Sequence, residues 1–248
     1  MEVHAHSHTA RKKWTHYFWE FLMLFLAVFC GFLAEYKLEH TIEHQREMKF
    51  AKLLYEDFKK DTALIDNVMR VKTWRTRKLD SLFYFLSLPD LQSNASAIYY
   101  YGHFVTLNYQ FAPNDATIQQ LSSSGSLRYF SNLELYNAIT SYYSNCGWNK
   151  KAEEANKINI SQITAKMFQG EQFYSLVSNA TDIRGLIRYP SRNVPFQLLT
   201  TDKSTLNEFL VQAKQSNFND YGIMNILGVL RTQLGKLIDE IKKEYHLK

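Results

Sequence analysis

An apolar stretch near the N-terminus, residues 17–34, contains a single charged residue, Glu20. With its flanks, residues 14–36, it reaches about 30 Å as a helix, which matches the hydrocarbon core of a bilayer. Aromatic residues of the kind that favour membrane interfaces flank it: Trp14, Tyr17, Trp19 and Tyr36. The pattern predicts a transmembrane helix, with Glu20 near enough to the basic end to reach the interface without a mechanistic role.

Three other interpretations of this stretch fit less well. A cleaved signal peptide needs small residues before its cleavage site, but Phe32 occupies such a position. A lipoprotein signal needs a small residue before the modified cysteine, and Phe29 precedes Cys30. A buried core helix is rarely apolar on every face directly after a basic N-terminus.

Beyond the apolar stretch, hydrophobic residues recur at helical spacing, and no Pro or Gly occurs between Phe32 and Leu88. The positions are Phe50, Leu54, Phe58, Ile65, Val68, Leu79, Leu82 and Leu86. They predict one long helix that leaves the membrane and ends near Pro89. The aromatic segment 97–113 has the composition of a strand, but its helical surroundings favour a buried helix or a packed irregular segment.

Capping signals divide the middle of the chain. Residues 114–125 predict a short helix that opens at Asn-Asp and stops in a Ser-Ser-Ser-Gly run. Ser131 and Glu134 have the spacing of a capping box, which predicts a helix through Tyr143. A further helix is expected over 150–178.

The C-terminal part is expected to hold a loop at 185–200 and then two helices. The last helix carries an apolar seam in steps of four and three: Ile223, Leu227, Leu230, Leu234, Leu237, Ile241 and Tyr245. We expect this seam to pack antiparallel against the long helix at 50–86. Leu230→Asp should then unfold the domain, whereas Arg75→Ala should be tolerated.

These elements predict an all-α protein. A short basic, His-rich tail at 1–13 precedes the transmembrane helix at 14–36, which continues into the long helix of a soluble helical-bundle domain at 37–248. Hydrophobic residues make up 46% and charged residues 21% of the chain, as in folded proteins. The mean hydropathy is negative, which excludes several membrane spans.

Charge narrows the classes of partner. The net charge of +5 is modest and dispersed, and no nucleic-acid-binding module is present, so we expect no nucleic acid partner. Basic residues stand directly before the apolar stretch, at Arg11, Lys12 and Lys13. They favour a cytoplasmic N-terminus and an external domain. Basic residues also follow the stretch, at Lys37, Arg46, Lys49 and Lys52, and weigh against this orientation.

Two stretches of the chain resemble a group of uncharacterised single-pass membrane proteins of Bacteroidota bacteria. The first has an acidic residue early in the span, a late glycine and a charged helix behind it, here Glu20, Gly31 and residues 35–60. The second, residues 116–143, carries the group's pattern at Leu121, Ser124, Gly125, Leu127, Asn132, Leu135, Tyr142 and Tyr143. The resemblance implies a bacterial inner membrane with the soluble domain in the periplasm, and it implies no activity.

One motif suggests catalytic chemistry. His40, Glu43 and His44 spell H-x-x-E-H, in which two histidines one helical turn apart hold zinc and the glutamate acts as base. No third ligand is evident, so a solvated charged helix is the preferred interpretation. Alternating histidines in the tail, His4, His6 and His8, suggest at most weak metal binding. We therefore expect no cofactor, and no catalytic residue is assigned.

A basic cluster and a cysteine complete the candidates. The cluster, Arg70, Lys72, Arg75, Arg77 and Lys78, is interpreted as a solvated helix face, with an acidic partner as the alternative. Cys146 has no His or Asp nearby in the sequence and is interpreted as a plain buried thiol.

The sequence supports three functional hypotheses. The leading one is a membrane-anchored, extracytoplasmic interaction or scaffold protein, bound to the bilayer through residues 14–36 and to a protein partner or to itself. The second is a ligand-binding sensor-like domain that acts through a partner subunit. The third, a zinc hydrolase, depends on the H-x-x-E-H motif alone.

Overall fold

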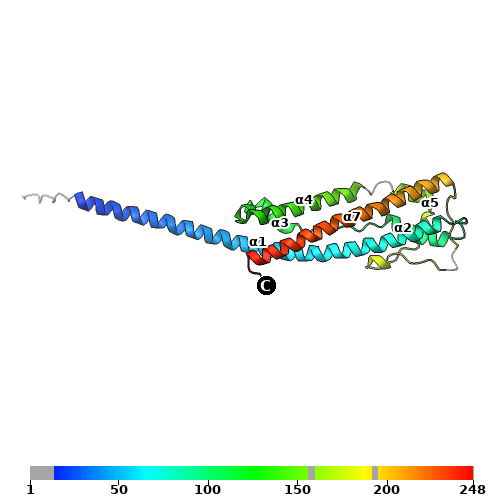
Figure 1. The fold of residues 1–248 in the computed structure, drawn as a ribbon, viewed down its shortest axis with the longest axis horizontal. Helices are drawn as coiled ribbons and strands as arrows, with labels where there is room; N and C mark the ends of the chain where they lie inside the picture. Colours follow the sequence, from blue (N-terminus) through cyan, green and yellow to red (C-terminus); the bar gives the residue numbers. More distant parts are fainter. Residues whose placement is uncertain (1–13, 156–159, 192–194, 248) are drawn as a thin grey trace, which may run out of the picture. The chain divides into compact units, whose positions relative to one another are not determined.

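The computed structural model describes residues 14–155, 160–191 and 195–247, and these are all-α (Figure 1). The helices are α1 (Trp14–Leu86), α2 (Ala95–Thr106), α3 (Ala116–Ser123), η1 (Ser126–Tyr129), α4 (Leu133–Ala155), α5 (Ile160–Met167), α6 (Gly170–Tyr174), η2 (Ile183–Gly185) and α7 (Lys203–Glu244). The described residues form no strand, and two isolated β-bridges join Phe168 to Leu198 and Val177 to Ile187. The predicted fold class is confirmed.

The chain divides into two compact units, one up to Phe50 and one from Ala51 onward. The described part of the first unit is a single stretch of α1. Its apolar window is long enough to cross a membrane, and none of that window is buried within the protein. Phe21 exposes 65% of its surface and Leu24 exposes 69%. A helix that is apolar on every side is suited to an apolar environment and not to water.

In the second unit, α7 lies beside α1 and α4 and runs antiparallel to both (Figure 1). Arg231 pairs with Asp66 of α1, and further along Asp220 pairs with Lys72. Asn145 of α4 contacts Gln233 of α7. The predicted antiparallel packing of the last helix against the long helix is confirmed, and α4 is a third member of the bundle.

Six of the eight predicted apolar positions of α1 are fully buried, and the other two, Phe50 and Leu86, are half-buried. On α1, Leu54, Phe58, Ile65 and Val68 are fully buried, as are Leu79 and Leu82 further along. Every residue of the apolar seam of α7 is buried: Ile223, Leu227, Leu230, Leu234, Leu237, Ile241 and Tyr245. Burying one such side chain is worth about 1.5–3 kcal/mol, so both stripes stabilise the unit.

A second hydrophobic cluster contains buried residues from the end of α1, from α2, α5 and α6, and from the start of α7. Tyr99 and Phe104 of α2 are fully buried in it. Gly102 is required here, because a Cβ at this position would lie 2.5 Å from the Phe168 ring. The aromatic segment 97–113 is therefore a buried helix up to Thr106 and an irregular packed segment after it, so each of the two expectations holds for one part.

Three predicted boundaries were wrong. The capping residue of α4 is Asn132 and not Ser131, since the Asn132 Oδ1 accepts a hydrogen bond of 3.1 Å from the Leu135 N–H. The expected helix over 150–178 is interrupted: α4 extends to Ala155, and two short helices, α5 and α6, follow. The two helices expected after the loop are one, α7, which is 42 residues long.

Candidate functional site

The H-x-x-E-H residues lie on one exposed helix face but point to different neighbours. The His40 Nε2 lies 3.0 Å from the Tyr36 hydroxyl, and its Nδ1 is 4.0 Å from the Glu43 carboxylate. His44 instead lies 3.6 Å from Glu47. Among the described residues no group of three or more His, Cys, Asp or Glu side chains is arranged to hold a metal ion. His4, His6 and His8, and the basic triplet Arg11, Lys12 and Lys13, lie outside the described residues.

The basic cluster at 70–78 does not form one solvated face. Arg70 and Arg77 are exposed, whereas Lys72 and Arg75 are buried, with 3% and 5% of their surface exposed. The interpretation of the whole cluster as solvated is therefore wrong for these two residues. Their spacing of three places them on the inner face of α1, where only a paired cation is tolerated.

Arg75 donates four hydrogen bonds from its five N–H groups. Its guanidinium forms an ion pair with Asp220 of α7, and its Nη2 donates to the Ser216 Oγ at 2.7 Å. Its Nε donates to the Phe104 carbonyl at 2.6 Å and its Nη2 to the Val105 carbonyl at 3.0 Å. These carbonyls belong to the last turn of α2, which has no intrahelical donor for them. Arg75 thus caps α2 and joins it to α7.

Lys72 and Glu153 are less completely paired. The Lys72 Nζ donates to the Asp220 Oδ1 at 3.1 Å, which occupies one of its three N–H groups. Glu153 of α4, only 4% exposed, accepts from the Asn149 Nδ2 through Oε1, but Oε2 has no hydrogen-bond partner of normal geometry. Burial raises the pKa of Glu153, and the nearby Lys72 charge opposes this rise.

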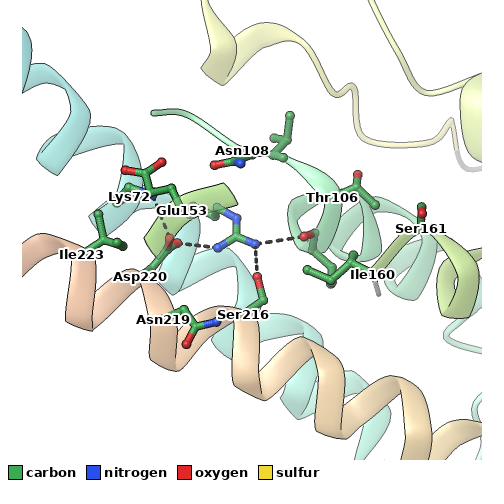
Figure 2. Close-up of a pocket in the computed structure, with 13 residues that line it drawn as sticks. Lys72, Thr106, Asn108, Glu153, Ile160, Ser161, Ser216, Asn219, Asp220 and Ile223 are labelled. Atoms are coloured by element: carbon green, nitrogen blue, oxygen red, sulfur yellow. Dashed lines mark hydrogen bonds and ion pairs between the residues drawn. The ribbon is translucent and has the colours of Figure 1, made fainter. Parts of the chain in front are cut away.

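A cavity of about 130 Å³ opens beside these residues (Figure 2). Residues from five helices line it: Lys72 and Arg75 of α1, Val105 and Thr106 of α2, Glu153 of α4, Ile160 and Ser161 of α5, and Ser216, Asn219, Asp220 and Ile223 of α7. Leu107 and Asn108 complete the lining. The arrangement can bind a small polar molecule, because charged groups meet apolar walls in a partly open cavity.

A second candidate site is the outer face of α7, opposite its apolar seam. It carries five large hydrophobic residues with 37–71% of their surface exposed: Val211, Phe218, Tyr221, Ile226 and Val229. Between Lys214 and Arg231 the only charged residue of the helix is Asp220, which is buried. An exposed helix face with several large apolar residues is typical of a protein-binding surface.

The segment 116–143 that resembles the bacterial group has structural roles. Leu121, Leu135 and Tyr142 are buried, and the Tyr142 hydroxyl donates to the Asp61 Oδ2 at 2.8 Å. Gly125 has a φ of 64°, a left-handed conformation that favours glycine. Cys146 is buried as expected, and burial raises its pKa to about 12, which makes it a poor nucleophile.

No protein-family model matches the chain, and no curated protein or solved structure proves similar to it. The two candidate sites are therefore interpreted from their own geometry.

Sequence analysis did not identify Asp220 and Glu153. One signal for Asp220 was available, because it lies three residues before Ile223 on the buried face of α7. An acidic residue in line with an apolar seam needs a buried cation. For Glu153 no comparable signal exists, since it lies in a helix whose predicted boundaries were wrong.

Proposed function

We propose that this chain is a membrane-anchored interaction protein that assembles with a second copy of itself through the outer face of α7. The observation that carries the proposal is the uncharged, hydrophobic character of that face over 215–230. A neutral face offers nothing to select an acidic or a basic partner. Pairing with an identical face leaves no charge unpaired.

The spacing on this face suits a pair of parallel helices. Phe218, Gly222, Asn225 and Val229 follow one another in steps of four, three and four, as in a coiled-coil seam. Gly222 supports the same interpretation. A Cβ there would meet no atom within 4 Å, so the protein's own packing does not require glycine. A missing side chain at an exposed helix position lets a partner helix approach closely.

The anchor holds both copies in one membrane. Two copies held in one membrane by the apolar stretch of α1 face the same way and meet about a two-fold axis along the membrane normal. In an isologous interface of this kind, residues near the axis face their own copies. Phe218 would then contact Phe218 of the second copy.

We further propose that the anchor lies in a bacterial inner membrane, with the N-terminus in the cytoplasm and the domain in the periplasm. The basic residues at 11–13 and the resemblance to bacterial single-pass proteins support this orientation. In intact cells, an external protease should digest the domain once the outer membrane is opened and the inner membrane is still sealed. Protection under these conditions would reverse the orientation.

Disulfide cross-linking of the full-length protein in membranes tests the pairing. In a Cys30→Ser background, Val229→Cys should give a covalent dimer on mild oxidation, because position 229 belongs to the seam of the proposed interface and faces its own copy there. Gln120→Cys, at an exposed position of α3, is the matched control and should stay monomeric. Equal cross-linking at both positions would refute a specific interface.

Complementary charges test the symmetry. Phe218→Glu and Phe218→Lys should each abolish the dimer, because like charges face each other across the axis. Co-expression of the two variants with different tags should restore a mixed dimer. A dimer that survives in Phe218→Glu alone, or a monomeric unmodified chain, would overturn the proposal.

The cavity beside Glu153 favours a second candidate function, a ligand-binding sensor domain that acts through a partner. The two candidates are compatible, since the cavity is lined by the inner side of α7 and the proposed interface is its outer side.

A further inference from the structure

The strongest unexplained feature of the molecule is a pair of buried, oppositely charged side chains, Lys72 and Glu153, that lie near each other without forming an ion pair. Lys72 and Glu153 are close enough for the ammonium to lower the pKa of the carboxyl, yet no direct ion pair joins them in the described part of the chain. Lys72 donates one hydrogen bond, to Asp220, and the Oε2 of Glu153 has no hydrogen bond of normal geometry, although the Gln110 side chain lies near enough to lower the pKa of this carboxyl. Buried polar groups are rarely left in this state, so a bridging molecule is expected between them.

The cavity places both groups within reach of one such molecule. Figure 2 shows Lys72 and Glu153 close together, with Asp220 beside them and Ile160 and Ser161 across the opening. A volume of about 130 Å³ is slightly less than that of cavities of ~150 Å³ that bind benzene, so the occupant has about six non-hydrogen atoms at most.

The charges around the cavity decide the chemical class of the occupant. Two cations, Lys72 and Arg75, face two carboxylates, Asp220 and Glu153, so the set is balanced when all four are ionised. An anion or a cation alone would leave one buried charge uncompensated, which is costly. A zwitterion keeps the balance, because its carboxylate accepts from Lys72 while its ammonium donates to Glu153.

We propose that this cavity is a binding site for a small zwitterionic amino acid, with glycine and alanine as the sizes that fit. The carboxylate lies toward Lys72, the ammonium toward Glu153, and a short side chain lies against the apolar wall of Val105, Leu107 and Ile223. Asp220 and Arg75 hold Lys72 and the end of α2 in place and do not themselves bind the amino acid. This site is independent of the proposed interface on the outer face of α7.

Thermal unfolding and calorimetric titration of the full-length protein in detergent test the site. Glycine and alanine should raise the melting temperature in a concentration-dependent manner, as ligands that bind only the folded state do. Acetate and methylamine, which each carry half of the zwitterion, should bind at least tenfold more weakly. Leucine and phenylalanine should have no effect, because the cavity is too small for their side chains.

Two conservative variants of neighbouring residues test the site, one at Glu153 and the other, as the control, at Glu154. Glu153→Gln keeps the shape of the side chain and removes its charge, and should weaken alanine binding at least tenfold. Glu154→Gln changes the next residue of α4, which is exposed, and should bind as the unmodified chain does. If Glu153→Gln does not fold, the ligand series on the unmodified chain still decides the matter. No response to glycine or alanine, meaning ordered water only, would overturn the proposal, as would equal binding of acetate.

Discussion

Residues 14–36 and 51–86 belong to the same helix, α1, but they differ in how their apolar residues are distributed around the helix and in how far these residues are exposed. In the first stretch apolar residues occur on every side and stay exposed, with Trp14 at 80% and Leu24 at 69%. In the second they recur every three or four residues, and Leu54, Phe58 and Ile65 are fully buried. Secondary structure is the same in both, so the distribution of apolar residues around the helix decides which environment each stretch needs.

The largest expected effect separates these two stretches physically. Full-length protein should stay in the membrane pellet after an alkaline carbonate wash, because the apolar stretch has no partner of its own within the described residues. Deletion of residues 1–36 should release the remainder as a soluble fragment. Full-length protein in the wash supernatant would contradict a membrane anchor.

The next largest effect is a difference in folding between aspartate substitutions on the inner and outer sides of α7. Leu230→Asp should unfold the second unit, because it removes apolar burial worth about 1.5–3 kcal/mol and buries an unpaired carboxylate at additional cost. Val229→Asp, one residue earlier and 60% exposed, should keep the fold. Circular dichroism on heating measures both. Equal loss of structure in the two variants would mean that the inner and outer faces are wrongly assigned.

Substituting a buried and an exposed arginine of α1 should change the free energy of unfolding by very different amounts. The sequence alone predicts that Arg75→Ala is tolerated, but the structure predicts a cost of the order of 3 kcal/mol, because the substitution leaves the Asp220 Oδ2 and two carbonyls of α2 without a donor. Arg77→Ala, at an exposed position two residues away, should change the free energy of unfolding by less than about 0.5 kcal/mol. Chemical denaturation of both variants checks this. A small effect at Arg75 would mean that its buried contacts contribute little to the free energy of unfolding.

This contrast also shows which features the sequence could predict. The long helix and the seam of α7 were predicted correctly because both follow from the local spacing of apolar residues. The burial of Arg75 was not predicted, because it depends on Asp220, which is 145 residues away in the chain. Local spacing identifies a face, but the partner that makes a buried charge tolerable lies on another element.

The wrong boundaries have a similar cause. The two helices expected after the loop are one, because α7 continues through Gly222, and residues on both sides of it are buried, Phe209 and Ala213 before and Ile223 after. Tertiary packing overrides the weak helix propensity of one glycine, which costs about 1 kcal/mol. The cavity could not be predicted at all, since five separate helices line it.

A smaller effect concerns His103, which is 3% exposed and stacks on Phe173 at 3.7 Å. Its Nε2 donates to the Phe173 carbonyl at 2.6 Å, and burial lowers its pKa from 6.5 to about 4. Since the unfolded chain takes up this proton first, stability should fall as the pH drops from about 6.5 to about 4, by up to about 3 kcal/mol.

Urea unfolding of the full-length protein between pH 7.5 and pH 4 measures this loss. The raised pKa values of Asp61 and Glu153 act in the opposite direction, so the comparison must be made against His103→Gln. The variant removes the titrating group, and it should lose less stability than the unmodified chain over the same range. Parallel pH profiles for the two proteins would mean that His103 is protonated equally in both states.

The smallest expected effect is at the H-x-x-E-H residues of the first unit. His44→Ala should change the melting temperature by no more than an ordinary surface substitution, because His44 exposes 66% of its side chain and its recorded contact is with the neighbouring Glu47. Purified protein should contain no stoichiometric zinc, since His40 is oriented by the Tyr36 hydroxyl and no third ligand stands beside the pair in the described residues. Metal analysis and melting curves of both proteins test this together. Zinc at one equivalent that disappears in His44→Ala would show that the exposed face of α1 holds a metal, and a hydrolase would then replace the interaction protein as the better proposal.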